Sequence, residues 1–147
     1  MERINVKITL QNGAKVPVYA TDGSAGADLS ALLASDFVLR AGEFALIPTG
    51  ISIELPKGYE AQVRPRSGLA AKFGITVLNA PGTIDSDYRG EVKVILINHS
   101  KNDYIIRNGD RIAQMVVSPC LQADFTAELS LNQTGRGCGG FGSTGRA

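Results

Sequence analysis

Short runs in which apolar and polar residues alternate recur along the chain, and no stretch keeps the 3.6-residue period of an amphipathic helix. The runs cover residues 4–10, 44–55 and 59–63, and residues 92–97 and 112–117 are apolar enough for more deeply buried strands. Turn-forming pairs such as Asn12-Gly13 and Asp22-Gly23 separate the runs. Many short strands joined by turns indicate an all-β sandwich or jelly roll. One short helix is expected over residues 68–72, which contain good helix formers.

The composition of the chain changes sharply only after Leu131. Six of its 17 glycines fall within residues 135–147, and Phe141 is the one large apolar residue of residues 132–147. Such a segment buries too little apolar surface to fold alone. We therefore predict a single β domain over residues 1–131 and a flexible glycine-rich arm over residues 132–147. The arm is either a disordered end or a segment that becomes ordered on a ligand.

Composition and charge exclude several classes of protein. One histidine, His99, and two cysteines, Cys120 and Cys138, are too few for a zinc site built from several His and Cys ligands. A formal net charge of +1 provides no broad basic surface for nucleic acid or an anionic membrane. No apolar run approaches the ~18 to 20 residues that span a bilayer, and the N-terminus lacks a signal-peptide layout. We expect a cytoplasmic protein that binds neither nucleic acid nor membrane.

Two groups of residues could bind an anion such as phosphate. Arg66, Ser67 and Gly68 precede the expected helix, where unpaired N–H groups and the helix dipole favour negative charge. The simpler interpretation is that Ser67 is an ordinary N-cap beside solvated arginines. The arm offers glycine N–H groups, hydroxyls, the Arg136 cation and an aromatic face at Phe141.

Residues 79–90 form a turn-rich stretch that combines an amide, two carboxylates and a phenol. In a hairpin, Asp85 and Asp87 would lie on the same side unless a turn intervenes. A carboxylate facing a pocket can take a proton from water. The amide of Asn79 offers both a donor and an acceptor to the edge of a base. A polar hairpin with no chemical role is the alternative interpretation.

Three further polar features lie near predicted strand ends. Asp28 stands among small residues at the start of a short strand. Asp110 and Arg111 are expected to pair at the turn before the last strand. Gln114 lies inside that apolar strand, so its amide needs a hydrogen-bond partner.

Five segments resemble, in order and spacing, the five motifs of the homotrimeric dUTPases. They are AGADLSA (25–31), PRSGLA (65–70), GTIDSDYRGEV (82–92), GDRIAQM (109–115) and RGCGGFGSTG (136–145). The resemblance implies a jelly roll that assembles as a homotrimer, with each active site drawing on three subunits. It also implies hydrolysis of dUTP to dUMP and pyrophosphate, which keeps uracil out of DNA and supplies dUMP for dTMP synthesis.

The resemblance also implies how the nucleoside is bound. Asp85 would be the base that activates the water attacking the α-phosphorus. Asn79 and the neighbouring backbone at Thr83 and Ile84 would read uracil. Tyr88 would lie against the deoxyribose, where a ribose 2′-hydroxyl would clash. Lys93 would lie near the nucleotide.

The same resemblance assigns the phosphate contacts and the metal. The phosphates would be bound by Arg66, Ser67, Gly68, Arg136, Gly142, Ser143 and Thr144. Gln114 would help to hold the chain, and Phe141 would stack on uracil as the arm closes over a neighbouring subunit. Asp28 would contact Mg²⁺ through water, with the ion held mainly by the three phosphates.

Two other functions compete with dUTP hydrolysis. One is a dCTP deaminase of the same superfamily, against which Asp87-Tyr88 and the complete arm argue. The other is a catalytically idle jelly-roll module that only binds nucleotide or protein. The presence of Asp85, Arg66 and Arg136 argues against such a module.

Overall fold

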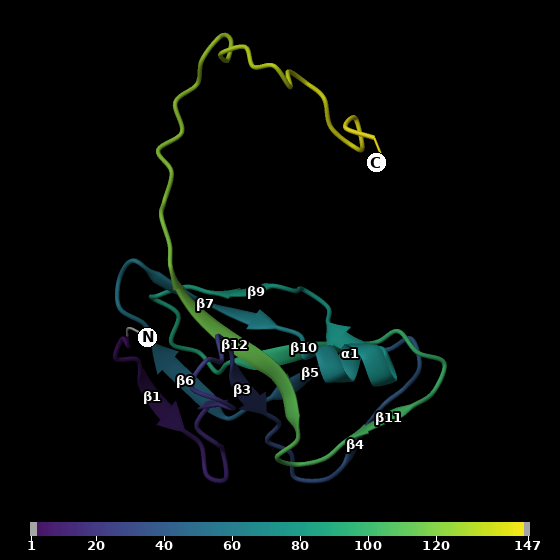
Figure 1. Ribbon diagram of the computed structural model, residues 1–147. Coiled ribbons are helices and arrows are strands. Elements are labelled where there is room, and N and C mark those ends of the chain that lie inside the picture. Colours follow the sequence, from purple (N-terminus) through teal and green to yellow (C-terminus); the bar gives the residue numbers. More distant parts are fainter. Residues whose placement is uncertain (1–2, 146–147) are drawn as a thin grey trace.

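The computed structural model describes residues 3–145, which form twelve short strands and one helix (Figure 1). The elements are β1 (Lys7–Leu10), β2 (Val18–Tyr19), β3 (Ala27–Ser30), β4 (Phe37–Leu39), β5 (Phe44–Pro48), β6 (Ile51–Glu54), β7 (Tyr59–Arg64), α1 (Ser67–Phe73), β8 (Ile75–Val77), β9 (Gly82–Ile84), β10 (Lys93–Asn98), β11 (Tyr104–Ile106) and β12 (Arg111–Pro119). The prediction of an all-β chain with one short helix is confirmed. The predicted run over residues 44–55 is divided into β5 and β6 by a turn at Thr49 and Gly50.

The strands form four antiparallel groups. The largest is a five-stranded sheet in the order β2-β3-β12-β7-β9, and a three-stranded sheet has the order β5-β10-β8. Two pairs, β1-β6 and β11-β4, complete the arrangement. Apolar side chains from all four groups meet in one core, which includes Leu29, Ile47, Val94, Leu96 and Ile112.

Burial along β10 alternates, although its sequence predicts a deeply buried strand. Val94 and Leu96 are buried, whereas Ile95 and Ile97 on the opposite face are only partly covered. Ile95 pairs with Leu46 of β5 and Ile97 pairs with Phe44. Leu46 and Phe44 are 56% and 63% exposed, so these four residues form an uncovered apolar face, here called the outer face. An apolar sheet face of this kind normally packs against another surface.

Helix α1 starts at Ser67 and ends where Gly74 adopts a left-handed conformation, with φ of 65°. Only Leu69 of this helix is buried. The N-cap is Arg66, with no side-chain cap hydrogen bond, and Ser67 is the first helical residue. The interpretation of Ser67 as an ordinary N-cap is therefore wrong, because the chain turns into the helix one residue earlier.

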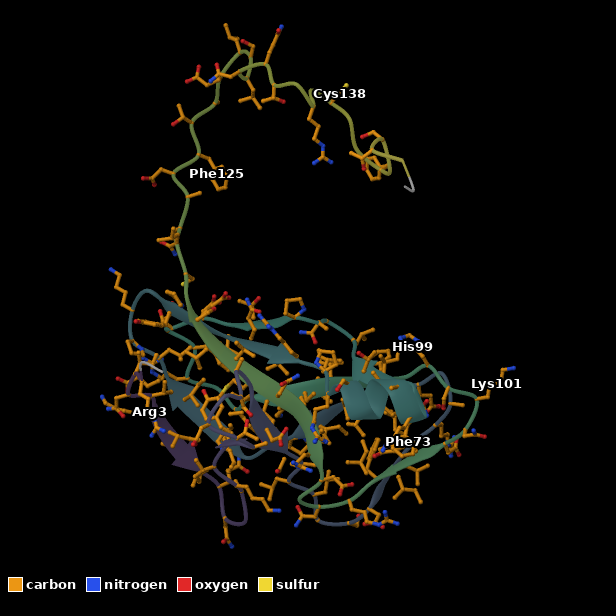
Figure 2. All side chains as sticks on the ribbon, viewed as in Figure 1. Arg3, Phe73, His99, Lys101, Phe125 and Cys138 are labelled. Carbon is orange, nitrogen blue, oxygen red and sulfur yellow. The ribbon has the colours of Figure 1, made fainter. Side chains whose placement is uncertain are left out.

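The last long segment leaves the body of the protein at the end of β12. Cys120 donates its N–H to Gly58 O at 2.9 Å, and the chain beyond it extends away from the sheets (Figure 1). Phe125 and Cys138 project from this segment far from the core (Figure 2). The predicted domain boundary at residue 132 lies inside the extended segment, and the division into domain and arm stays a prediction.

Candidate active site

Most of the predicted nucleoside-binding residues line one cavity of about 460 Å³. These residues are Asn79, Thr83, Ile84, Asp85, Tyr88 and Lys93. The cavity lies between β9 and β10, and its apolar wall is completed by Leu46 of β5, Val63 of β7 and Ile95 of β10. A half-apolar cavity with an amide and a carboxylate at its rim suits a flat heterocycle with polar edges.

The segment that carries Asp85 passes from one sheet to another and does not form a hairpin. Strand β9 pairs with β7, whereas β10 pairs with β5 and β8. The chain turns after β9, where Tyr88 donates its N–H to Asp85 O at 3.1 Å. Because of this turn, Asp85 lines the cavity and Asp87 does not.

The Asp85 carboxylate makes no ion pair with any residue between 3 and 145. It is exposed at the rim of the cavity, next to the buried Ile84. A carboxylate without a cationic partner keeps its lone pairs available for a water molecule. The position therefore suits a general base.

Glu91 also lines this cavity, although its sequence context did not single it out. Its Oε1 accepts a hydrogen bond from Gly50 N at 2.9 Å, and its Oε2 lies 3.6 Å from Lys93 Nζ. Glu91 and Lys93 are two residues apart at the start of a strand, a spacing that places side chains on the same face. That spacing was the only sequence signal for the pair.

A second cluster of predicted site residues surrounds Asp28. Its Oδ1 accepts from Arg66 Nε at 3.1 Å and its Oδ2 accepts from Arg111 Nη1 at 2.9 Å. Arg66 Nη1 also donates to Arg111 O at 3.0 Å. The Asp28 side chain is 17% exposed, so two arginines share one largely buried carboxylate.

The expected pairing of Asp110 with Arg111 is wrong. Asp110 Oδ2 accepts from the backbone N–H of Arg107 at 2.8 Å, which closes the turn before β12. Arg111 starts β12 opposite β3, so its side chain reaches Asp28 on that neighbouring strand. A single sequence carries no signal for this contact between distant residues.

Gln114 holds the backbone just before Arg66. Its Nε2 donates to Pro65 O at 3.0 Å, which supplies the partner that its amide was predicted to need. The side chain lies close over Gly26, where a Cβ would come within 3.2 Å of Gln114 Cβ. Gln114 thus links β3, β12 and the start of α1.

A wider depression of about 610 Å³ opens beside this cluster, lined in part by Arg66, Arg111 and Tyr104. The rings of Tyr104 and Phe73 lie with centroids 5.1 Å apart. Burial, and secondarily the charge of Asp110, raises the pKa of the Tyr104 phenol above its usual value. The phenol therefore stays neutral at physiological pH and keeps its O–H donor.

One chain does not bring the cavity and the Asp28 cluster together. Ile84, just before Asp85, pairs with Ala61 near the start of β7, whereas Arg66 follows the other end of that strand. At a strand rise of about 3.3 Å per residue, the two positions are about 15 Å apart. Asp85 lines the first cavity, whereas Arg66 is held by Asp28 and lines the wider depression, so within one chain the two side chains face different cavities.

Residues 132–145 of the arm line neither the first cavity nor the wider depression beside the Asp28 cluster. Neither cavity is lined by a residue between 120 and 145. Arg136 Nε donates to Gly139 O at 2.8 Å, and Phe141 is fully exposed. The predicted contacts of Arg136, Phe141, Gly142, Ser143 and Thr144 with a nucleotide stay predictions.

Residues 3–145 contain neither a group of metal-ligating side chains nor a membrane-spanning helix. Within residues 3–145, no three His, Cys, Asp or Glu side chains are grouped closely enough to hold a metal ion. In the same part of the chain, no helix has the length and apolar character needed to cross a membrane.

Comparison with proteins of known sequence gives consistent matches. The dUTPase family model matches residues 12–145. A deoxyuridine 5′-triphosphate nucleotidohydrolase of Rickettsia bellii (strain OSU 85-389) is 60% identical over 131 residues, which is 89% of this chain and 87% of the relative. One from Chlamydia pneumoniae is 59% identical over 137 residues, covering 92% and 94% of the two chains.

Solved structures match the fold at lower identity. A Staphylococcus bacteriophage 80alpha dUTPase with dUpNHpp has a TM-score of 0.83 and 24% identity, covering 97% of this chain and 99% of that one. A mutant dUTPase from phage phi11 of S. aureus, described with a structural Mg(II) ion, has a TM-score of 0.79 and 22% identity, with coverage of 88% and 100%. The predicted jelly-roll fold is confirmed. The family model spans nearly the whole chain and relatives near 60% identity cover most of it, so this chain belongs to the dUTPase family.

Proposed function

We propose that this protein hydrolyses dUTP to dUMP and pyrophosphate at sites that three copies of the chain complete. The main support for this proposal is that the predicted site residues Asp85 and Arg66 of one chain line two separate cavities. Asp85 lines one cavity and Arg66 belongs to the Asp28 cluster, about 15 Å away on the same chain. A neighbouring subunit that presents its Arg66 to this cavity completes the site. Hydrolysis would keep uracil out of DNA and supply dUMP for dTMP synthesis.

The outer face supports assembly. Phe44 and Leu46 are more than half exposed, and Leu46 and Ile95 also line the nucleoside cavity. A second copy packed on this face would bury apolar surface and lie directly beside the cavity. In a closed threefold assembly every copy makes the same contacts, so each cavity would lie beside the same surface of a neighbouring copy.

The cavity recognises the nucleoside part of dUTP. Asn79 and the backbone of Thr83 and Ile84 supply donors and acceptors for the uracil edge. The Tyr88 ring stands at the same cavity and excludes a ribose 2′-hydroxyl. Lys93, held near Glu91, contributes positive charge at the nucleotide.

The phosphates require a different set of residues. A triphosphate brings about four negative charges, and the chain has no P-loop lysine motif to meet them. Arg66, Ser67 and Gly68 of one subunit bind these phosphates, with Arg66 oriented by Asp28. The arm of a further subunit closes over the site, where Phe141 stacks on uracil and Arg136, Gly142, Ser143 and Thr144 contact phosphate.

The residues present fit a Mg²⁺ ion that arrives with the substrate. This ion keeps several waters and is commonly held by substrate phosphates with one or two carboxylates. Asp28 is the carboxylate on the phosphate side and would contact the ion through water, because each of its oxygens has a lone pair left beyond its arginine partner. When bound, Mg²⁺ offsets phosphate charge and orients the chain of phosphates.

The reaction is a displacement at the α-phosphorus. Asp85 takes a proton from a water molecule as the water oxygen bonds to that phosphorus. The bond from the α-phosphorus to the bridging oxygen breaks, and pyrophosphate leaves with the electron pair. The arginines stabilise charge that spreads onto the phosphate oxygens.

An assay of two nucleotides tests this function. We expect pyrophosphate release from dUTP in the presence of Mg²⁺, no ammonia release from dCTP, and a mass by light scattering of three times 15.5 kDa. Ammonia from dCTP with dUTP untouched would indicate a deaminase. Binding of dUTP without turnover would indicate an idle module.

A further inference from the structure

Tyr88 stands at the nucleoside cavity with its ring folded back over the next residues of its own loop. Its phenol donates to Glu91 O at 3.0 Å. Tyr88 is 46% exposed, so surrounding side chains do not fix its ring by burial alone. Its position must therefore be set by the phenol hydrogen bond and by the backbone beneath the ring.

Gly90 lies directly under that ring. A Cβ at position 90 would lie 2.5 Å from Tyr88 Cζ and 2.9 Å from Cε2, and closer still to the phenol oxygen. The three heavy atoms nearest to such a Cβ all belong to Tyr88. Gly90 does not have a positive φ, so its backbone conformation is open to other residues. The ring of Tyr88 is thus the reason that position 90 has no room for a side chain.

The carbonyl that accepts the phenol is itself held firmly. The Glu91 side chain accepts from Gly50 N at 2.9 Å, and the following residue, Val92, donates its N–H to Ile51 O at 2.8 Å. The buried Thr49 hydroxyl donates to Val92 O. Residues 91 and 92 are therefore anchored to the turn between β5 and β6, and Tyr88 is tied to a fixed support.

We propose that Gly90 is a positioning residue that determines the selectivity for 2′-deoxynucleotides by allowing the Tyr88 ring to lie against the anchored Glu91 carbonyl. The inference rests on the proposed function, in which Tyr88 excludes the ribose 2′-hydroxyl. A ring that is tied down cannot move away from that hydroxyl. Any side chain at position 90 displaces the ring and opens space for ribose.

The test compares kcat/KM for dUTP with kcat/KM for UTP in wild type, Gly90→Ala, Tyr88→Ala and the double variant. We expect Gly90→Ala to lower the ratio of the two values by about tenfold or more. In the Tyr88→Ala background the same glycine change should alter the ratio by less than about twofold, because the clashing ring is absent. Gly23→Ala is the matched control, since a Cβ there meets nothing within 4 Å.

A second readout needs no substrate. In protein labelled with 3-fluorotyrosine, the Tyr88 fluorine signal, identified by its loss in Tyr88→Phe, should shift in Gly90→Ala and stay unchanged in Gly23→Ala. If Gly90→Ala lowers the Tm, the same glycine change in the Tyr88→Ala background should not lower the Tm further. This readout reports the contact even if the chain does not hydrolyse dUTP.

Three results would overturn the proposal. The first is a folded Gly90→Ala protein whose dUTP-to-UTP ratio stays within about twofold of wild type. The second is an equal drop in ratio with and without the Tyr88 ring. The third is an unshifted Tyr88 fluorine signal. A shifted signal with an unchanged ratio would refute the role in selectivity and leave dUTP hydrolysis standing.

Discussion

Replacing Asp85 by asparagine should lower kcat for dUTP by about 10²- to 10⁴-fold, the range expected for loss of a general base. Asparagine has nearly the same shape but no basic oxygen to accept the proton of water. The Asp85 side chain is exposed and makes no ion pair with residues 3–145, so the fold should not depend on its charge. Pyrophosphate release measures the loss, and calorimetry with the inactive variant should show dUTP binding close to wild type.

Asp87→Asn is the matched control for this change. It removes the same charge two residues away, on a side chain that does not line the cavity. The control should keep near wild-type kcat. Near-normal turnover of Asp85→Asn, or an equal loss in both variants, would remove Asp85 from the role of base.

Deletion of residues 135–147 should leave a folded trimer whose kcat/KM for dUTP is lower by about 10²-fold or more. Within the described part of the chain, neither cavity is lined by a residue of the extended segment after Cys120, so the core should not need the deleted residues. The deletion removes the aromatic ring, the arginine and the hydroxyls proposed to close over the substrate. Activity assays together with thermal unfolding and light scattering separate the two effects.

Phe141→Ala is the smaller change on the same segment. It should raise KM by about tenfold through loss of stacking on uracil, with Tm unchanged. A truncated chain that unfolds or becomes monomeric would show that the arm is structural. A truncated chain with full activity would show that the arm has no part in the reaction.

Local patterns were sufficient to predict several of the strands and the helix, but not short strands such as β2, β4, β8 and β11. The alternation over residues 59–63 became β7, and the good helix formers after Pro65 became α1. Gln114 was predicted to need a partner because an amide in an apolar strand cannot stay unpaired, and Pro65 O supplies it. These features depend on the few residues around each position.

Features that depend on strand pairing could not be predicted in this way. Arg111 pairs with Asp28, 83 residues away, because β12 lies beside β3, whereas the nearby Asp110 closes a turn. The hairpin considered for residues 79–90 is absent because β9 and β10 belong to different sheets. Sequence neighbours do not reveal which strands will lie side by side.

The resemblance to the dUTPases predicts a site shared between subunits, and the positions of the predicted residues in one chain are consistent with that proposal. Asp85 and Arg66 lie toward opposite ends of β7, a separation set by the antiparallel register of β7 and β9. Asp85 lines one cavity and Arg66 lines the other. We therefore expect a neighbouring subunit to bring its Arg66 guanidinium to the nucleotide at which Asp85 is proposed to act.

Mixing two inactive variants tests the shared site most directly. Asp85→Asn and Arg66→Ala proteins should each be inactive, and co-expressed mixed trimers should recover about a quarter of wild-type activity, the random frequency of sites with both residues intact. Asp85→Asn mixed with Asn79→Ala is the control, because both residues line the same cavity of one chain, and it should recover nothing. Absence of recovery in the first mixture, with mixed trimers demonstrated, would contradict the account.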